Sequence, residues 1–279
     1  MACPPIRAVA LRLRWLGTSC FHVDLGGLEV LMDPYLDSRS SFNPPPVLSS
    51  QLVDVDVVAV THGHYDHFAD APKVLASSKP ILVASRELCN YAKQSLGLSE
   101  DRLIALEAGG RAEVDGCVVE ATKAVHLSPL EVVRWLIGDF SYAPSSWEEL
   151  RRTYLKRLSA EIPESAFKVP VGPLQGYVLE RGGFKLWNVS ETKLFEELKE
   201  VAGRIKAHVS LVSVAGGYEQ HSALLASWIK PRVVVPYQFD RIFEAQALLG
   251  DVRLFESKLA ELEPSVEVLT PKPGEWYSF

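Results

Sequence analysis

Residues 61–67 read THGHYDH, which places three histidines and one aspartate within the six positions 62–67. Histidine is the commonest metal ligand in proteins, and imidazoles combined with carboxylates suit zinc, iron or manganese better than magnesium or calcium. A lone histidine after a strand is more often structural than a ligand. Four residues of metal-binding type at this spacing reverse that preference, so a metal site is the first hypothesis for the chain.

The composition limits the class of protein. The chain has 279 residues, of which 47% are hydrophobic, and this is enough for one large domain or two small ones. The formal net charge is −6 and there is no basic run, whereas nucleic-acid binding requires clustered Lys and Arg. We therefore expect a small-molecule substrate and no nucleic-acid partner.

Other features of the sequence favour a cytoplasmic protein. The four cysteines form no Cys-x-x-Cys pair, which favours reduced thiols. The N-terminus lacks the charged segment and long apolar stretch of a signal peptide, and no apolar run approaches the roughly 20 residues of a membrane span. We expect a cytoplasmic protein with no membrane span. The sequence leaves homo-oligomer formation open.

The first half of the chain is predicted to begin with a strand meander and to continue with strands and helices in alternation. Residues 55–60 form a β-branched apolar run, typical of a buried strand, and the histidine cluster follows it directly. The expected strands cover residues 11–16, 20–25, 28–32, 55–60, 80–84, 103–106, 111–115 and 117–122, and the expected helices cover residues 70–78 and 85–96.

The last third repeats this order of strands followed by alternating helices and strands. The expected strands cover residues 176–180, 184–187, 208–214, 232–236 and 266–269, and the expected helices cover residues 192–202, 220–229 and 253–262. Strands from each half with helices outside predict an α/β sandwich, in which two mixed β-sheets lie between helical layers. We expect residues 1–279 to form a single domain of this kind.

Residues 129–161 interrupt this alternation and predict an inserted helical hairpin. Ser146 and Glu149 have the spacing of a capping box, and the segment is rich in aromatic residues such as Trp135 and Tyr154. Such helices could form a lid over an apolar substrate or a dimer contact, or they could pack on the core of the protein itself. The sequence does not decide between these roles.

The cluster matches the pattern H-x-H-x-D-H between a strand and a helix, and the chain resembles the metallo-β-lactamase superfamily. Asp33 in LMDPYLD and His126 in AVHLSP extend the match. So do two later stretches, GYVLERGGFKLWNVSETKLF and VVVPYQF. The detailed pattern is similar to the branch of simple metal-dependent hydrolases that includes ascorbate-phosphate lactonase and phosphodiesterases. The resemblance implies a metallo-β-lactamase-like αββα sandwich.

The resemblance also implies a set of metal ligands. His62, His64 and His126 would hold a first ion, and Asp66 and His67 would belong to a second. The implied cofactor is zinc, as one or two ions, with manganese or iron as alternatives. Such a site leaves a position open for water and lowers the pKa of that water toward about 7.

Two positions depart from the family pattern. The bridging aspartate of the family falls on Glu191, and its last histidine falls on Gln238. Glutamine offers a neutral carbonyl oxygen, which is a weaker zinc ligand than imidazole. The site could still hold two ions, hold one ion at the first position, or have lost catalysis while the fold was kept.

Further residues are candidates for second-site or substrate contacts. Asp33 would border the metal pocket, although an aspartate before proline is also ordinary turn chemistry. His221 follows Gly216-Gly217 in a loop whose counterpart in relatives faces the substrate. Gln238 is the third candidate, and Asp240 is close to it in sequence.

These residues predict a metal-dependent hydrolase in which a metal-bound hydroxide attacks a phosphodiester, lactone or related ester. Asp66 would be the catalytic residue that orients this hydroxide or accepts a proton. The alternative is a metal-binding but catalytically weak sensor or interaction protein, which Glu191 and Gln238 favour. A nuclease is a third hypothesis, disfavoured by the charge. The sequence does not name the substrate.

Overall fold

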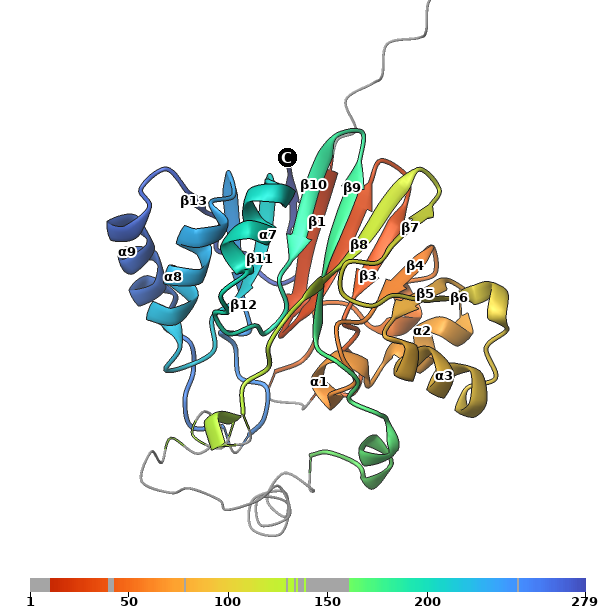
Figure 1. The fold of residues 1–279 in the computed structure, drawn as a ribbon. Helices are drawn as coiled ribbons and strands as arrows, with labels where there is room; N and C mark the ends of the chain where they lie inside the picture. Colours follow the sequence, from red (N-terminus) through yellow and green to blue (C-terminus); the bar gives the residue numbers. More distant parts are fainter. Residues whose placement is uncertain are drawn as a thin grey trace, which may run out of the picture.

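The computed structural model describes residues 11–39, 43–77, 79–128, 130–132, 134, 138, 161–244 and 246–279. Within these residues the strands form two seven-stranded sheets, which pack face to face with helices on their outer faces (Figure 1). This confirms the predicted αββα sandwich with two mixed sheets.

The first sheet is antiparallel at one side and parallel at the other. Its spatial order is β14 (Trp276–Ser278), β1 (Leu11–Gly17), β2 (Cys20–Leu25), β3 (Glu29–Met32), β4 (Val57–Ala59), β5 (Ile81–Ala84) and β6 (Leu103–Ala105). The pairs from β14 to β3 are antiparallel, and those from β3 to β6 are parallel. The sequence predicted all of these strands except β14.

The second sheet repeats this design. Its spatial order is β13 (Glu267–Val268), β12 (Val233–Tyr237), β11 (Val209–Ser213), β10 (Phe184–Asn188), β9 (Gln175–Arg181), β8 (Cys117–Lys123) and β7 (Arg111–Val114). The pairs from β7 to β10 are antiparallel, and those from β10 to β13 are parallel. Both halves of the chain therefore run from a meander into parallel crossover strands.

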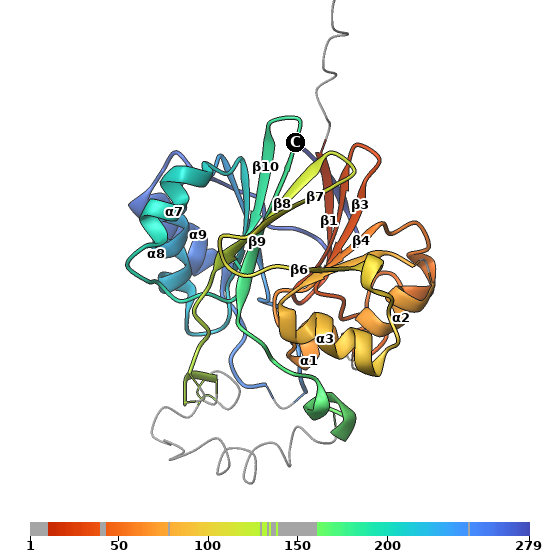
Figure 2. The same cartoon turned by 45° about the vertical axis from the view of Figure 1, so that its right-hand side comes forward.

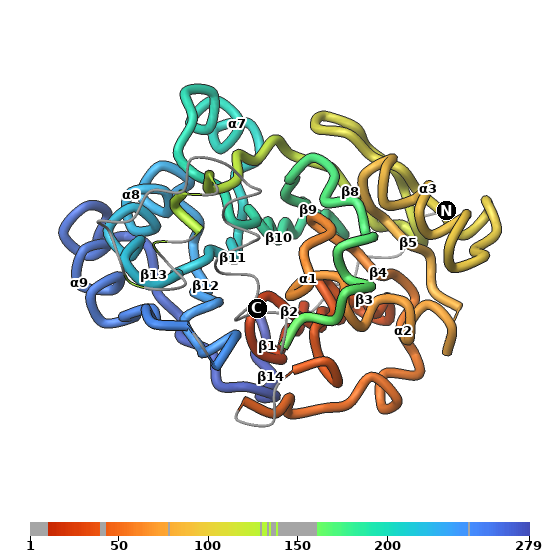
Figure 3. Tube along the Cα trace, turned by 90° about the horizontal axis from the view of Figure 1, so that it is seen from below, coloured from red at the N-terminus to blue at the C-terminus, as the bar shows by residue number. Residues whose placement is uncertain are grey.

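Helices cover the outer face of each sheet. The helices α2 (Ala71–Ser77) and α3 (Arg86–Ser95) pack on the first sheet, and α7 (Leu198–Ile205), α8 (Glu219–Ile229) and α9 (Val252–Leu262) pack on the second (Figure 2). A view from below places these two helical layers on opposite sides, with the short helix α1 (Tyr65–Phe68) near the middle (Figure 3). None of the helices in the described part of the chain is long and apolar enough to cross a membrane.

The alternation of side chains along each strand builds the core. In β1, Leu11, Leu13 and Trp15 point into the space between the sheets, where they are fully or almost fully buried. In β4, Val57 points into this space, while Val58 packs under the helices of the first layer. Strands buried on both faces have the continuous apolar sequence from which this strand was predicted.

The predicted helix over residues 192–202 is wrong at its start, because α7 begins only at Leu198. The preceding residues instead tie to the chain after β8. The Val125 amide donates to Thr192 Oγ1 at 3.0 Å, and the Lys193 amide donates to the Val125 carbonyl at 2.8 Å. These bonds compete with helix formation and hold the chain directly after position 191.

Most of the predicted hairpin over residues 129–161 lies outside the described residues, including Ser146, Glu149 and the aromatic side chains of its centre. Its roles as a lid or a dimer contact therefore stay predictions. The described start of the segment carries a capping box of its own. The Ser128 amide donates to Glu131 Oε2 at 2.6 Å, and the Glu131 amide donates to Ser128 Oγ at 3.4 Å.

Candidate metal centre

The THGHYDH stretch changes from strand to helix within a few residues, and this change aims its side chains. His64 is the N-cap of α1 with an extended backbone, φ −67° and ψ 156°. Asp66 and His67 lie in the short helix that follows. The chain turns from an extended segment into a helix after His64. His62 and His64 therefore point to one group of metal-type side chains, and Asp66 and His67 point to another.

Gly63 lets a second segment cross this stretch closely. Its amide donates to the Val171 carbonyl at 2.8 Å, and a Cβ on Gly63 would lie only 2.0 Å from the Pro170 carbonyl oxygen. A side chain at this position would push the crossing segment away. The glycine between the histidines is therefore required by packing, not by metal chemistry.

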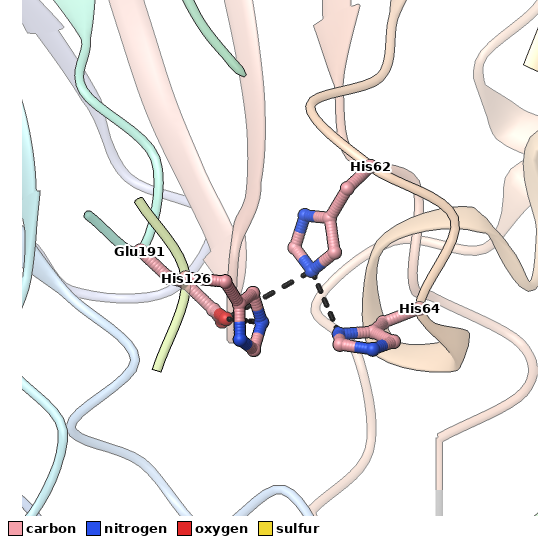
Figure 4. A group of neighbouring side chains, drawn as sticks. All are labelled: His62, His64, His126 and Glu191. Atoms are coloured by element: carbon pink, nitrogen blue, oxygen red, sulfur yellow. Dashed lines mark hydrogen bonds and ion pairs between the residues drawn. The ribbon is translucent and has the colours of Figure 1, made fainter. Parts of the chain in front are cut away.

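Three chain segments bring a first group of metal-type side chains together. His62 and His64 follow β4, His126 follows β8, and Glu191 follows β10. The ligand atoms of these four residues all lie within 4.8 Å of one another. His62 Nε2 lies 2.9 Å from His64 Nδ1, and Glu191 Oε2 lies 3.3 Å from His126 Nε2 and 3.9 Å from His62 Nε2. Figure 4 shows the four side chains converging from these segments.

A second group lies beside the first and shares Glu191. It contains Asp66, His67 and Glu191, again with all ligand atoms within 4.8 Å of one another. His67 Nε2 lies 2.9 Å from Glu191 Oε1 and 3.6 Å from Asp66 Oδ2. The structure therefore brings together every residue that the resemblance proposed as a ligand, although their roles as ligands stay predictions.

Asp33 supports the histidines from behind. It is fully buried and adopts a positive φ of 47°. Its Oδ1 accepts the Thr61 amide at 2.7 Å, and its Oδ2 lies 2.9 Å from Thr61 Oγ1 and 3.0 Å from His67 Nδ1. A carboxylate on Nδ1 fixes the orientation of the ring and turns Nε2 toward the centre. Asp33 thus lies outside both donor groups and positions His67.

Thr61 is the residue at this site whose role sequence reasoning missed. Besides its bonds to Asp33, its Oγ1 lies 3.0 Å from His62 Nδ1 and 3.3 Å from His67 Nδ1. One hydroxyl therefore contacts a histidine of each group. The sequence feature that could have indicated this role is the position of Thr61 between the apolar strand and His62. A small hydroxyl residue there fits under the rings of His62 and His67.

Burial and neighbouring charges divide the histidines into two kinds. Burial, with the neighbouring histidines, lowers the pKa of His62 well below its ordinary value, and burial lowers the pKa of His64 to about 3. Burial also lowers the pKa of His67, but the carboxylates of Glu191, Asp66 and Asp33 outweigh it and raise that pKa well above the ordinary value. His62 and His64 are thus held in the neutral form that binds metal.

The two acidic residues at the centre shift in opposite directions. Burial raises the pKa of Asp66 to about 6, against the opposing attraction of His67. Burial acts in the same sense on Glu191, but His67 and His126 outweigh it and hold the pKa of Glu191 well below its ordinary value. Glu191 is therefore an ionised carboxylate enclosed by imidazoles.

The first group fits a transition metal. Three imidazoles and one carboxylate are the donor types of zinc, iron and manganese sites. His126 Nε2 is buried, and no described residue gives it a hydrogen bond of good geometry, although it points toward Glu191. His126 Nδ1 lies 2.7 Å from the Leu127 carbonyl, which leaves Nε2 as the nitrogen that faces the centre.

The remaining candidates lie outside both groups. His221 accepts a hydrogen bond from the Leu194 amide at Nε2, 3.2 Å away, so it holds the loop that carries Glu191. Asp240 accepts a hydrogen bond from the Thr18 backbone amide. It also forms an ion pair with the buried guanidinium of Arg39 at 2.9 Å. Gln238 lies closer to the centre, since its side-chain amide donates to Glu191 Oε1.

Comparisons with known proteins agree with this geometry. A family model described as a beta-lactamase superfamily domain matches residues 29–149. A metal-dependent hydrolase of Methanopyrus kandleri, classed as UPF0173, is 27% identical over 270 residues, which are 96% of this chain and 99% of that protein. These matches support a relationship to the metallo-β-lactamase superfamily. A second UPF0173 metal-dependent hydrolase, from Methanosphaera stadtmanae, is 25% identical over 96% of this chain and 99% of its own length.

Solved structures share the fold of this chain over nearly its whole length. The metallo hydrolase Igni18 of Ignicoccus hospitalis has a TM-score of 0.69 at 21% identity and covers 97% of this chain and 98% of its own. An isothiocyanate hydrolase from Delia radicum gut bacteria has a TM-score of 0.66 at 17% identity, covering 96% and 98%. At these identities the likeness concerns the fold.

The first prediction concerns the carboxylate behind the ligands. Replacing Asp33 by Asn removes the charge that orients Thr61, whose Oγ1 contacts Nδ1 of the proposed ligand His62, so we expect metal affinity to fall by about 10–100-fold. The measurement is a competition titration of metal binding against a chelator. The control is Asp101→Asn, a change at an exposed aspartate. Equal affinities of the Asp33 variant and the unmodified protein would contradict the positioning role.

The second prediction concerns the release of protons when the metal ion binds. Burial lowers the pKa of His126, but its attraction to Glu191 outweighs this and raises that pKa above the ordinary value. The metal-free ring thus keeps its proton to higher pH than an ordinary histidine, and a metal ion must displace it. We expect metal affinity to fall as the pH falls and protons to be released on binding at neutral pH. Calorimetry in two buffers of different ionisation enthalpy measures this release; an affinity independent of pH between 8 and 6 would contradict it.

Proposed function

We propose that this chain is a metal-dependent hydrolase whose centre is formed by His62, His64, His126 and Glu191. The observation that carries the proposal is the convergence of these ligand atoms within 4.8 Å, from the ends of separate strands. Catalytic zinc sites commonly use three protein ligands and keep a position open for water or substrate, so the three imidazoles would bind the ion and Glu191 would border the open position. Zinc is the proposed metal, with manganese or iron as alternatives that the same donors accept.

A bound divalent ion would supply Lewis acidity and would lower the pKa of water so that hydroxide is available at neutral pH. Asp66 is the proposed general base. Its buried carboxylate has a pKa raised to about 6, so it can accept and return a proton close to neutral pH. His67, whose Nε2 lies 3.6 Å from Asp66 Oδ2, holds that carboxylate at the centre.

The proposed substrate is a small phosphodiester, lactone or related ester. An apolar cluster beside the centre includes Tyr35, Ile162 and Phe243, with Tyr65 of α1 and Tyr218 packed against it. Tyr65 directly precedes Asp66, so this cluster reaches the proposed base. Tyr35, Ile162 and Phe243 are buried, whereas Tyr65 and Tyr218 are partly exposed and could face an apolar substituent next to the reacting group of a substrate.

A metal-binding but catalytically weak protein is the second candidate, and one observation favours it. Gln238 occupies the position of a family ligand but donates its amide to Glu191. A superfamily member with this change could bind metal as a sensor or interaction protein.

The third prediction separates these candidates. We expect His64→Ala to lose the retained ion and to lower hydrolysis of a bis-aryl phosphate or a lactone by about 100-fold or more, because an imidazole ligand is removed. Elemental analysis and an assay with both substrates measure these effects. The control is His208→Ala, since His208 is exposed and precedes the start of β11, whereas Glu191 follows the far end of the parallel strand β10.

Activity on neither substrate with full metal content would favour the second candidate. An unchanged metal content in His64→Ala would contradict the ligand assignment. The absence of any retained ion in the unmodified protein, after supply of zinc, manganese and iron, would contradict both candidates.

A further inference from the structure

The carboxylate of Glu191 divides its two oxygens between the two groups. Oε2 faces the first group, at 3.3 Å from His126 Nε2 and 3.9 Å from His62 Nε2. Oε1 faces the second group and accepts from His67 Nε2 at 2.9 Å and from the Gln238 amide. Oε1 therefore already has two partners, whereas Oε2 is directed toward the three imidazoles of the first group.

The orientation of the Gln238 side chain follows from its partners. An ionised carboxylate only accepts hydrogen bonds, so Gln238 must present its NH₂ group to Glu191. Its carbonyl oxygen then points to the other side, where it accepts from the hydroxyl of Ser213 at the end of β11. Oxygen is the only atom through which glutamine binds a metal ion, and here it faces Ser213 and not the second group.

The backbone fixes this arrangement. Gln238 is 2% exposed and adopts a positive φ of 61°. Its backbone N–H donates to the Thr18 carbonyl at 3.1 Å. Ser213 is also held, because Ser222 Oγ donates to its backbone carbonyl at 2.7 Å. Turning the carboxamide by half a turn would place its oxygen against the Glu191 carboxylate, two acceptors without a proton between them.

We infer that Gln238 is a positioning residue that replaces a second metal ligand by a hydrogen bond, so that the protein retains one ion per chain, at the first group. The bond from Gln238 fixes Oε1 of Glu191 and thereby aims Oε2 at the first group. Asp66 and His67 then hold no retained ion of their own. This inference rests on the proposed function.

The test compares metal stoichiometry in the full chain and in Gln238→His. Each protein is titrated with Co²⁺, whose visible spectrum reports binding, and metal content is measured after removal of weakly held ions by a chelating resin. We expect an end point of one equivalent for the unmodified protein and two for Gln238→His, because an imidazole supplies the missing donor. Gln94→His, which adds a histidine on the exposed side of α3, is the control and should remain at one.

A second variant tests the positioning role without adding a ligand. Gln238→Leu keeps a similar volume but cannot donate to Glu191, so we expect the end point to stay at one while Co²⁺ affinity falls by about 10–100-fold and the visible spectrum shifts. Thermal unfolding of each variant shows whether it is folded. An unchanged affinity and spectrum in folded Gln238→Leu would overturn the positioning role.

The outcomes separate the inference from the function on which it rests. Two retained ions in the unmodified protein would overturn the inference and leave the hydrolase proposal standing. One retained ion in both the unmodified protein and folded Gln238→His would overturn the claim that position 238 limits the stoichiometry. No retained ion in any protein would overturn the proposed function and the inference with it.

Discussion

The buried carboxylate of Glu191 is the constraint on which the centre depends. A buried charge is costly unless it is paired, and Glu191 is surrounded by His62, His67 and His126. His62, His64 and His67 follow β4 of the first sheet, whereas Glu191 follows β10 of the second. The carboxylate therefore joins the two sheets at the end where β4, β8 and β10 finish, and the proposed chemistry lies at this junction.

Much of the fold could be predicted because strand alternation and apolar runs report burial directly. The elements that escaped prediction are short or depend on distant contacts. The four residues of α1 are too few to show helical periodicity, β14 pairs with β1 across the whole chain, and α7 starts late because residues 192 and 193 bond to Val125. The candidate ligands could be proposed from residue types and spacing. The direction of the Gln238 amide could not, because Ser213 and Glu191 meet it only in the folded protein.

The fold of the superfamily does not fix its chemistry. Among the solved structures that share it are an isothiocyanate hydrolase and CmlA, a diiron β-hydroxylase of Streptomyces venezuelae, of whose chain the match covers 53%. The features from which the chemistry of this chain is argued are local. Glu191 and Gln238 lie next to each other at the second group, while Asp33 and Thr61 hold the histidines in place. These contacts favour a centre with one well-formed metal position and a neighbouring carboxylate that handles protons.

Anomalous diffraction from zinc-loaded crystals of the unmodified protein tests this account most directly. The account predicts one strong peak at the zinc edge, at about 2.0–2.1 Å from nitrogens of His62, His64 and His126 and on the side of these rings that Oε2 of Glu191 faces. A second peak of equal height between Asp66 and His67, or a single peak there, would contradict it.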